Sequence, residues 1–327
     1  MATADQVKAL VRSHAEGDDS QFYSVAMQVA ARAARGGQNK VAGELRDLID
    51  EAKQRASQPA RQLRPVPVAQ PRGELSDLLA VSYPEERLAD LALPSDVAER
   101  LERVITEQRQ ADRLRQHGFQ PLRSLLLLGP PGTGKTMTAK AIAGELHLPL
   151  FLIRLESLIT KYMGETAAKL RLVFDAVEST RGVYLFDEVD ALGGDRATGN
   201  DVGEIRRVLN SFLQFLEADD PASLIVATTN HPQLLDRAMF RRFGAVIEYP
   251  MPTPELAREV IRQRLASLSL RGINWKPIDE VAVGLSHGEL TLACDQAAKE
   301  TILEGRKTVR TTSLVSALRE RRHSSSN

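Results

Sequence analysis

The residues with the most recognisable chemistry lie at 129–136, where the sequence reads Gly-Pro-Pro-Gly-Thr-Gly-Lys-Thr. This segment matches the pattern G-x-x-x-x-G-K-[ST] and stands between an apolar run and a helical pattern, the context in which the motif has meaning. Its glycines allow a tight turn with inward-pointing N–H groups, and a helix N-terminus behind them favours anions. The segment therefore predicts a cradle for nucleotide phosphates. A chance glycine turn is the alternative, which the complete match disfavours.

Within this loop, two side chains have distinct expected roles. Lys135 should reach the β- and γ-phosphates, and the hydroxyl of Thr136 should be a ligand of Mg²⁺. ATP and Mg²⁺ are therefore the expected cofactors. The other residues predicted to contact the nucleotide are Pro130, Pro131, Gly132, Thr133, Gly134 and Met137.

A second group of chemical interest is the acidic pair Asp187-Glu188, which follows the apolar run 183–186. Ligands of open α/β sheets bind at the carboxyl ends of the strands, so both acids should lie beside the phosphates. Asp187 is expected to hold the Mg²⁺ shell, and Glu188 to orient and polarise the attacking water. The alternative is a solvated strand end, which the phosphate loop makes less plausible.

The elements that position these residues follow from the hydrophobic pattern. Short apolar runs alternate with longer helical patterns, which indicates a parallel sheet with helices on both faces. After Pro250 only helical patterns remain, so a small all-helical subdomain should follow the sheet. The predicted strands are 125–128, 150–153, 183–186, 224–227 and 245–247, and the predicted later helices are 254–270, 286–305 and 311–320.

These elements suggest a division of the chain into parts. Residues 1–57 are typical of a small helical bundle, as a cap, an oligomerisation element or a module that docks adaptors or substrates. The proline-rich stretch 58–75 is typical of an extended linker. The sheet domain is expected at 76–250, the helical subdomain at 251–320 and a disordered polar tail at 321–327.

Composition narrows the partners and the compartment. Lys and Arg balance Asp and Glu at 43 each, so the net charge gives no reason to expect a nucleic acid or an anionic membrane. Cys294 is the one cysteine, which excludes an intrachain disulfide and fits a reducing compartment; we interpret it as a buried helix residue. No signal peptide is visible, and the apolar run 125–128 is too short to span a bilayer. We expect a cytoplasmic protein without an intrinsic membrane segment.

With the phosphate loop and the Asp187-Glu188 strand together, residues 76–320 resemble the AAA ATPase family of the AAA+ superfamily. Single-module members such as katanin and spastin, and bacterial AAA proteins with one ring, look similar. The resemblance implies a P-loop α/β domain, a helical lid, ATP hydrolysis and a homo-oligomer, in this family a hexamer.

The same resemblance implies roles for residues after the acidic pair. Asn230, at the end of Ala227-Thr228-Thr229-Asn230, fits the polar sensor that holds the lytic water. Arg241 and Arg242 fit the arginines that reach the neighbouring subunit's site and stabilise the transition state. A surface salt-bridge pair is the alternative for these arginines, and which of the two dominates stays open.

Two further segments resemble family elements. Tyr162 and Met163 fit a pore loop that grips a polypeptide, with core packing at a helix start as the alternative. The loop 193–203 and the following Arg206-Arg207 are weaker candidates for a second pore loop and for a bridge between subunits.

In the helical subdomain, the segment 284–290 fits the part of the lid that closes over the base and the ribose. Gly288 is the expected close approach and His287 a possible ribose neighbour, and no arginine accompanies them. A helix N-cap at Ser286 with Glu289 three residues later explains the segment equally well, and both interpretations can hold together.

The leading hypothesis is a ring-forming ATPase that remodels, unfolds or disassembles protein substrates by threading them through a central pore. One alternative is a nucleotide-dependent switch that regulates a separate effector, such as a protease or nuclease. Another is a nucleic-acid motor or loader, which the balanced charge disfavours. No H-E-x-x-H segment occurs, so destruction of a substrate would need another polypeptide.

Overall fold

The computed structural model describes Ala26, Gly43, Pro71 and residues 73–158, 163–192, 211–216, 222–235 and 237–325 of the chain. The chain divides into two compact units, Met1–Val68 and Ala69–Asn327. In the first unit only Ala26 and Gly43 are described, and both are helical. The rest of the predicted bundle at 1–57, and most of the linker at 58–75, lie outside the described residues.

The second unit contains a six-stranded sheet with the strand order β1-β3-β4-β5-β2-β6. Strands β2 to β6 pair in parallel, as predicted, whereas the edge strand β1 pairs with β3 in antiparallel orientation and was not predicted. The strands are β1 (Leu79–Ser82), β2 (Ser124–Leu128), β3 (Leu150–Ile153), β4 (Val183–Phe186), β5 (Leu224–Thr229) and β6 (Ala245–Glu248). Every predicted apolar run falls within one of these strands.

The central strands are apolar throughout because both faces of the sheet are covered. In β4, Tyr184 and Phe186 pack into one hydrophobic cluster, while Val183 and Leu185 pack into another. This alternation is the period-two geometry of a strand, and it places a core on each face. Helices α5 (Ser95–Arg109) and α7 (Lys135–Leu146) supply the second cluster.

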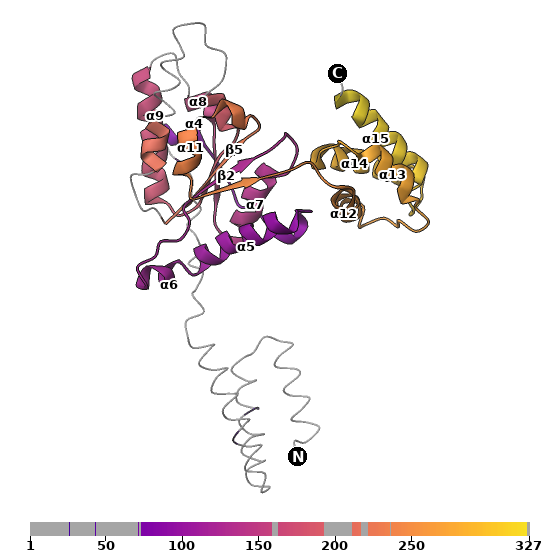
Figure 1. Ribbon diagram of the computed structural model, residues 1–327, viewed down its shortest axis with the longest axis horizontal. Coiled ribbons are helices and arrows are strands. Elements are labelled where there is room, and N and C mark those ends of the chain that lie inside the picture. The colour runs from indigo at the N-terminus through magenta and orange to yellow at the C-terminus, as the bar shows by residue number, and fades with distance from the viewer. Residues whose placement is uncertain are drawn as a thin grey trace. The chain divides into compact units, whose positions relative to one another are not determined.

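The opposite face is covered by α4 (Leu75–Leu78), α8 (Leu155–Leu158) and α9 (Met163–Ser179), together with residues 212–216. Figure 1 shows α9 and α5 on opposite sides of the sheet. The remaining short elements are α6 (Ala111–Gln116), α11 (Arg237–Arg242), η1 (Leu88–Asp90), η2 (Val189–Leu192) and η3 (Pro232–Leu234). No helix of the described ranges has both the length and the apolarity needed to span a membrane.

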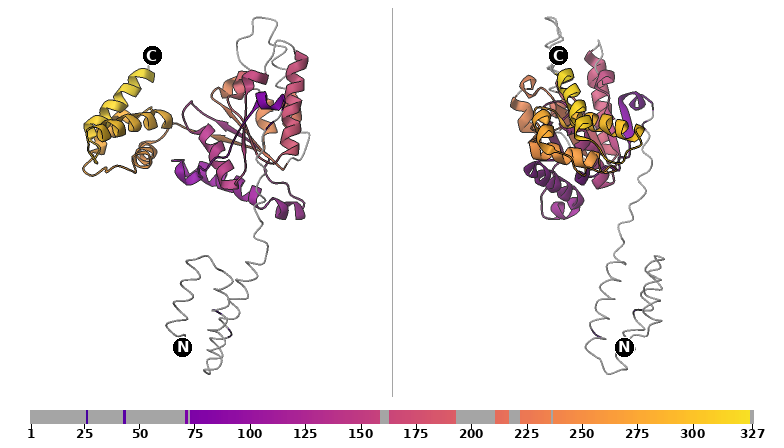
Figure 2. Two further views of the ribbon diagram at one scale, coloured as in Figure 1. Left: turned by 180° about the vertical axis from the view of Figure 1, so that it is seen from behind. Right: turned by 90° about the vertical axis from the view of Figure 1, so that its right-hand side faces the viewer.

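After β6 the chain forms a helical region that we call the lid, which Figure 2 shows gathered beside the C-terminus. Its helices are α12 (Pro254–Arg264), α13 (Trp275–Ala282), α14 (His287–Leu303) and α15 (Thr311–Ser325). They share a separate apolar cluster built around residues such as Ile261, Ile278, Leu290 and Leu318. Cys294 is fully buried in this cluster, as predicted, and burial raises the pKa of its thiol to about 12.

The lid departs from the sequence prediction in three places. Helix α12 ends at Arg264 rather than at residue 270, and α13 was not predicted because it is short and contains Pro277. Proline is tolerated there because the first turn of a helix needs no N–H donor. Helix α15 continues to Ser325, so the predicted disordered tail at 321–327 is helical over 321–325.

Candidate functional site

The candidate site lies where three neighbouring strands end. Strands β4, β5 and β2 are adjacent and parallel, so their carboxyl ends meet at one edge of the sheet. The loop that begins with Gly129 follows β2, Asp187 follows β4, and Asn230 follows β5. Segments far apart in the sequence are thereby brought to a single edge, the usual position for a ligand in an open α/β sheet.

The loop after β2 requires glycine at positions that contact other parts of the fold. Gly129 has a φ of 144°, and a Cβ there would collide with the carbonyl oxygen of Tyr249. Gly132 has a φ of 74°, and a Cβ there would lie 2.6 Å from Ser286 Oγ in the lid. Glycine therefore satisfies both the left-handed backbone and the close approach. The loop leads directly into α7, whose N-terminus faces the same edge.

Lys135, the first residue of α7, is held by oxygen atoms on three sides. Its ammonium donates to the carbonyl oxygens of Gly129 at 2.7 Å and Pro130 at 2.8 Å, and to Asn230 Oδ1 at 2.8 Å. Burial lowers the pKa of Lys135, although the negative charges of Asp187 and other nearby acids oppose that shift. A buried cation with exchangeable partners is suited to take up phosphate oxygens.

Asp187 is bound by two hydroxyl groups. The Thr136 hydroxyl lies 3.1 Å from Oδ1 and 3.0 Å from Oδ2, and the Thr228 hydroxyl donates to Oδ1 at 2.6 Å. A threonine hydroxyl and a carboxylate this close form a pair of hard oxygen ligands. This donor set fits Mg²⁺, which uses one or two protein oxygens together with phosphates and water.

Glu188 adopts a backbone conformation that is rare for a side chain of its kind. Its φ is 56°, and its N–H donates to Thr228 Oγ1 at 2.9 Å. Its carboxylate accepts a hydrogen bond from Asn230 Nδ2 at 2.9 Å. Because Asn230 Oδ1 accepts from Lys135, the amide connects the lysine of the loop with this acid. The arrangement can hold a water molecule between a base and a phosphate.

These residues line one end of a cleft of about 890 Å³, a volume within the range of small-ligand sites. We call this the polar end, made of Lys135, Thr136, Asp187, Glu188, Thr228 and Asn230. The apolar end is made of Leu91, Ala92, Leu93, Met137, Val260 and Leu292. Met137 and Leu292 keep much of their surface exposed, so this end offers uncovered apolar surface to a ligand.

The lid contacts the phosphate-binding loop directly. The N–H of Gly288 donates to the carbonyl oxygen of Gly132 at 2.9 Å. Ser286 caps α14 in a capping box with Glu289, so the N-cap interpretation of this segment is confirmed. His287 Nε2 lies 3.1 Å from the carbonyl oxygen of Ala92, an acceptor that requires the proton on Nε2. The lid is therefore tied both to the loop and to the apolar end.

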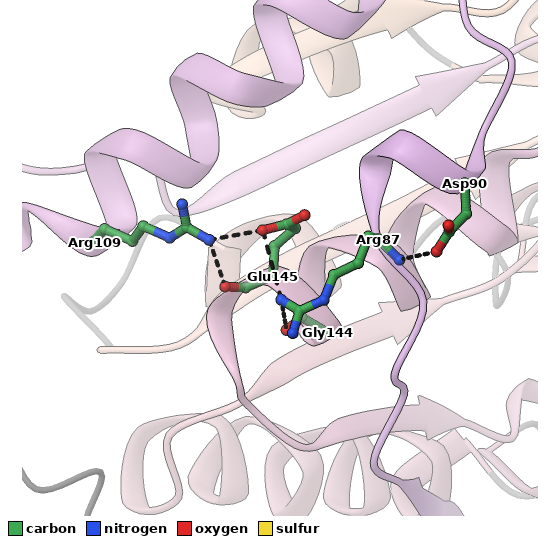
Figure 3. Close-up of polar contacts among 5 residues, drawn as sticks. All are labelled: Arg87, Asp90, Arg109, Gly144 and Glu145. Carbon is green, nitrogen blue, oxygen red and sulfur yellow. Dashed lines mark hydrogen bonds and ion pairs between the residues drawn. The ribbon is translucent and has the colours of Figure 1, made fainter. Parts of the chain in front are cut away.

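The apolar end depends on residues 84–93, which we call the strap. Figure 3 shows how the strap is attached to the C-terminal end of α7. Arg87 Nη1 donates to the carbonyl oxygen of Gly144 at 2.9 Å and lies 3.6 Å from Glu145 Oε2. Arg109 of α5 holds the same glutamate, 2.7 Å from both its backbone oxygen and its carboxylate. A Cβ at Gly144 would collide with the carbonyl oxygen of Glu86, so the strap passes very close to α7.

Several predicted site residues thus meet at one cleft, and others do not. Pro130 contributes its carbonyl oxygen to Lys135, whereas the rest of the predicted loop residues line the cleft, as does Gly288. Arg241 and Arg242 are described, at the end of α11, but do not line it, and Arg241 is exposed.

Most of the predicted pore residues lie outside the part of the chain that the structure describes. Tyr162 lies outside the described residues, as do the loop 193–203 and Arg206-Arg207. Met163 begins α9, but its side chain is not among those described.

Some residues of the cleft were missed by the sequence analysis. Arg264 of α12 lines it and forms two hydrogen bonds with Asp295, at 2.5 and 2.9 Å. Thr228 was quoted in the segment before Asn230 without a role of its own, and the strap carries no recognisable motif. A charged residue on an amphipathic helix gives no signal that separates it from a solvated surface. The packing of the lid and the strap around the cleft reveals Arg264 and the strap, and the register of β5 reveals Thr228.

A parallel sheet with a G-x-x-x-x-G-K-[ST] loop, a strand ending in two acids and a cleft between sheet and lid defines a P-loop nucleoside triphosphatase. Residues 125–251 match the family model described as "ATPase family associated with various cellular activities (AAA)". The uncharacterized AAA family ATPase y4kL of Sinorhizobium fredii is 32% identical over 311 residues, which are 94% of this chain and 92% of that protein. The chain belongs to the AAA family of ATPases, and it is an ATP-hydrolysing enzyme.

More distant relatives match the ATPase region. The ATP-dependent zinc metalloprotease FtsH 3 of Sphaerobacter thermophilus is 31% identical over 72% of this chain and 49% of its own length. The proteasome-activating nucleotidase of Pyrococcus furiosus is 34% identical over 58% of this chain and 50% of its own. The chain thus spans about half the length of each. The crystal structure of the FIGL-1 AAA domain superposes with a TM-score of 0.61, at 25% identity, over 79% of this chain and 92% of that one.

Proposed function

We propose that this ATPase is a ring-forming motor, built as a hexamer, that remodels protein substrates with energy from ATP. The observation that carries the proposal is the position of Arg241 and Arg242 relative to the cleft. The lysine, the acids and the asparagine meet in one cleft, but Arg241 and Arg242 lie outside it at the end of α11. A cation that stabilises the transition state in trans explains both facts.

In the proposed site, the base of ATP lies at the apolar end and the phosphates at the polar end. Lys135 exchanges its contacts with Gly129, Pro130 and Asn230 for phosphate oxygens. Thr136 and Asp187 are the residues that would hold Mg²⁺. When bound, the metal neutralises charge on the β- and γ-phosphates.

The hydrolytic step uses the residues around Glu188. A water oxygen attacks the γ-phosphorus, the bond to the β–γ bridging oxygen breaks, and the bridging oxygen leaves with ADP. The Glu188 carboxylate accepts the proton that the water loses. Asn230 holds this carboxylate at 2.9 Å, in a position to orient the same water.

The contact between the lid and the loop gives a route from chemistry to motion. Gly288 is hydrogen-bonded to Gly132, so a change in the loop on hydrolysis displaces the N-terminus of α14. In the proposed mechanism this lid movement shifts neighbouring subunits and drags a polypeptide held by Tyr162 and Met163. The names of two relatives, a metalloprotease and a proteasome-activating nucleotidase, support a protein as the substrate.

Complementation between inactive variants tests the shared site. Glu188→Gln and the double variant Arg241→Ala/Arg242→Ala should each hydrolyse ATP poorly when alone. Mixed at equal amounts, they should regain up to about a quarter of the wild-type rate, because one interface in four combines both intact partners. The wild-type rate per subunit should also rise with protein concentration. A dilute monomer at full activity, indifferent to both arginines, contradicts the ring.

A second measurement separates a threading motor from a nucleotide-dependent switch. Tyr162→Ala should retain ATP hydrolysis while losing the ability to unfold a tagged fluorescent protein. If unfolding or activation of an effector continues unchanged in this variant, the switch is the better account. A pull-down with Glu188→Gln in the presence of ATP should then identify the bound protein.

A further inference from the structure

Thr228 is a buried polar residue of the cleft that has no role in the proposed hydrolytic step. It is the penultimate residue of β5 and only 1% exposed. On one side it is in register with Leu127 of β2, and on the other it follows Ala227, which is in register with Phe186 of β4. The register therefore places Thr228 level with Asp187, the first residue beyond the end of β4.

The single hydroxyl of Thr228 has two hydrogen-bond partners, one that needs a donor and one that needs an acceptor. It donates its proton to Asp187 Oδ1 at 2.6 Å and accepts the backbone N–H of Glu188 at 2.9 Å. A hydroxyl carries one donor and two acceptor sites, so both bonds can exist together. No other described side chain is hydrogen-bonded to both members of this acidic pair.

The bond to Glu188 matters because the chain turns sharply at that residue. Strand β4 ends at Phe186, and Glu188 has a φ of 56°, a left-handed conformation that disfavours a side chain. The N–H of Glu188 therefore has no strand partner, and the Thr228 hydroxyl takes that place. With the backbone fixed in this way, the carboxylate is directed to Asn230.

We propose that Thr228 is a positioning residue for ATP hydrolysis, whose hydroxyl orients the metal-holding carboxylate of Asp187 and fixes the strained backbone of Glu188. The proposal rests on the roles given above to these two acids. Thr228 touches neither phosphate nor water in this account, and it acts through its neighbours. Groups that orient metal ligands commonly change metal affinity or activity 10- to 100-fold when removed.

The test compares variants that keep the volume of the side chain with variants that keep its hydroxyl. Thr228→Val has nearly the same shape but loses both hydrogen bonds, and its kcat for ATP should fall by about 10- to 100-fold. Thr228→Ser keeps the hydroxyl and should stay within about threefold of the wild type. ADP affinity without metal should be unchanged in both, because the contacts made by the loop remain.

Two readouts do not depend on turnover. In Thr228→Val the Glu188 amide should exchange hydrogen faster, since it has lost its acceptor, whereas Thr228→Ser should keep its protection. The affinity for Mn²⁺ in the presence of ADP, measured by electron paramagnetic resonance, should fall about tenfold in the valine variant only.

Ser223→Ala is the matched control. Ser223 carries a buried hydroxyl and directly precedes Leu224, the first residue of β5, whereas Thr228 lies near the end of that strand. The Ser223 hydroxyl donates to the carbonyl oxygen of Val177 at 2.8 Å and accepts the N–H of Gly182 at 3.3 Å, far from the acids along the strand. Its removal should lower thermal stability and leave kcat and Mn²⁺ affinity unchanged. A Thr228→Val protein with wild-type kcat overturns the proposal, and so does an equal loss in Thr228→Ser.

If Thr228→Val does not fold, Thr228→Ala replaces it, and the serine variant must then exceed the alanine variant in kcat. If Glu188→Gln keeps the wild-type kcat, Glu188 is not the base, and the proposed function fails. Loss in Glu188→Gln with no loss in Thr228→Val is a failure of this inference alone.

Discussion

The side chains at the polar end of the cleft come from the carboxyl ends of neighbouring strands and from the first turn of α7, whereas those at the apolar end come from the strap, α7 and the lid. The polar end is joined by hydrogen bonds that run from Lys135 through Asn230 to Glu188, and from Thr136 through Asp187 to Thr228. The apolar end joins the strap, α7 and the lid by contacts between separate segments, such as the hydrogen bond between His287 and Ala92 and the packing of Ala92 in the apolar cluster of the lid.

This difference in construction suggests a division of labour. Strand register fixes Asp187, Glu188, Thr228 and Asn230 relative to one another, so the polar end can hold reacting groups in place. The apolar end joins separate segments that no strand register holds together, so it can open and close around a nucleotide. We therefore expect changes at the polar end to alter the rate of hydrolysis, and changes at the apolar end to alter nucleotide affinity.

The largest expected effect comes from removing the proposed base at the polar end. Glu188→Gln keeps the shape of the side chain but cannot accept a proton, so kcat should fall by about 10²- to 10⁴-fold. The dissociation constant for ATP should change little, because the acid is not needed to hold the phosphates. Steady-state ATPase assays and equilibrium binding check the two quantities. The exposed Glu99→Gln on α5 is the control, and an equal loss of affinity and rate in Glu188→Gln contradicts the division of labour.

A smaller effect is expected where the two ends meet, at Gly132. Gly132→Ala combines a left-handed φ of 74° with a Cβ only 2.6 Å from Ser286 Oγ, so either Ser286 gives up its cap on α14 or the lid moves away from the loop. ADP affinity, measured by calorimetry, should fall by about tenfold or more, the equivalent of about 1.4 kcal/mol.

Gly284→Ala is the matched control for this prediction. Gly284 has a φ of 85°, and a Cβ there meets nothing within 4 Å. The two variants share the backbone strain and differ in the collision with the lid. If both lower ADP affinity equally, strain alone explains the result and the contact between lid and loop is unimportant for binding.

The same contrast explains which parts of the site the sequence could predict. Lys135, Thr136 and the acidic pair lie in short motifs whose chemistry depends on neighbouring residues, and the structure brings them together at one sheet edge. The strap could not be predicted, because Arg87 and Gly144 are separated by 57 positions and neither belongs to a pattern. The role of Thr228 depends on strand register, which hydrophobic alternation does not specify for strands buried on both faces.

The fold was predicted where the apolar runs are buried between covering helices and missed at the antiparallel edge of the sheet. The parallel strands and both covered faces follow from repeated apolar runs. The antiparallel strand at 79–82 lies at one edge of the sheet, where one of its residues is buried, two are half-buried and one is exposed, so it does not stand out as an apolar run. Roles for Tyr162 and Met163, and for the bundle at 1–57, stay predictions.

A weaker effect is expected from loosening the strap. Arg87→Ala removes the hydrogen bond to the carbonyl oxygen of Gly144 and the ion pair with Glu145. The arginine side chain is 41% exposed, so solvent screens the pair and the loss should raise the ADP dissociation constant only about two- to fivefold. Fluorescence titration with a labelled ADP measures this change, and kcat at saturating ATP should be unaltered.

Arg115→Ala provides the comparison for the strap, because it removes a surface ion pair with Asp112 on α6, 3.7 Å apart, away from the cleft. It should leave ADP affinity unchanged. A loss of kcat in Arg87→Ala without a loss of affinity means that the strap acts on the polar end, and the proposed separation of the two ends is then wrong.

The smallest expected effect is a pH dependence of the contact between the lid and the strap. Burial lowers the pKa of His287 below its usual value of 6.5, and the hydrogen bond to Ala92 only partly opposes this shift. The folded protein therefore favours the neutral ring, while the unfolded chain takes up a proton more readily. The stability that depends on the neutral ring is present above pH 6.5 and is lost as the pH falls through the lowered pKa.

Trp275, the one tryptophan of the chain, lies in α13 of the lid and reports its unfolding by fluorescence. Between pH 7.5 and 5.5 the lid of the wild type should lose more stability than the lid of His287→Gln, which can still donate to Ala92 but does not titrate. The slope of the free energy of unfolding against pH is compared between the two proteins. All other titrating groups contribute equally to both slopes, because both proteins share them. Equal slopes, or a wild type that gains stability in acid relative to the variant, would mean that this single contact does not govern how the lid rests on the strap.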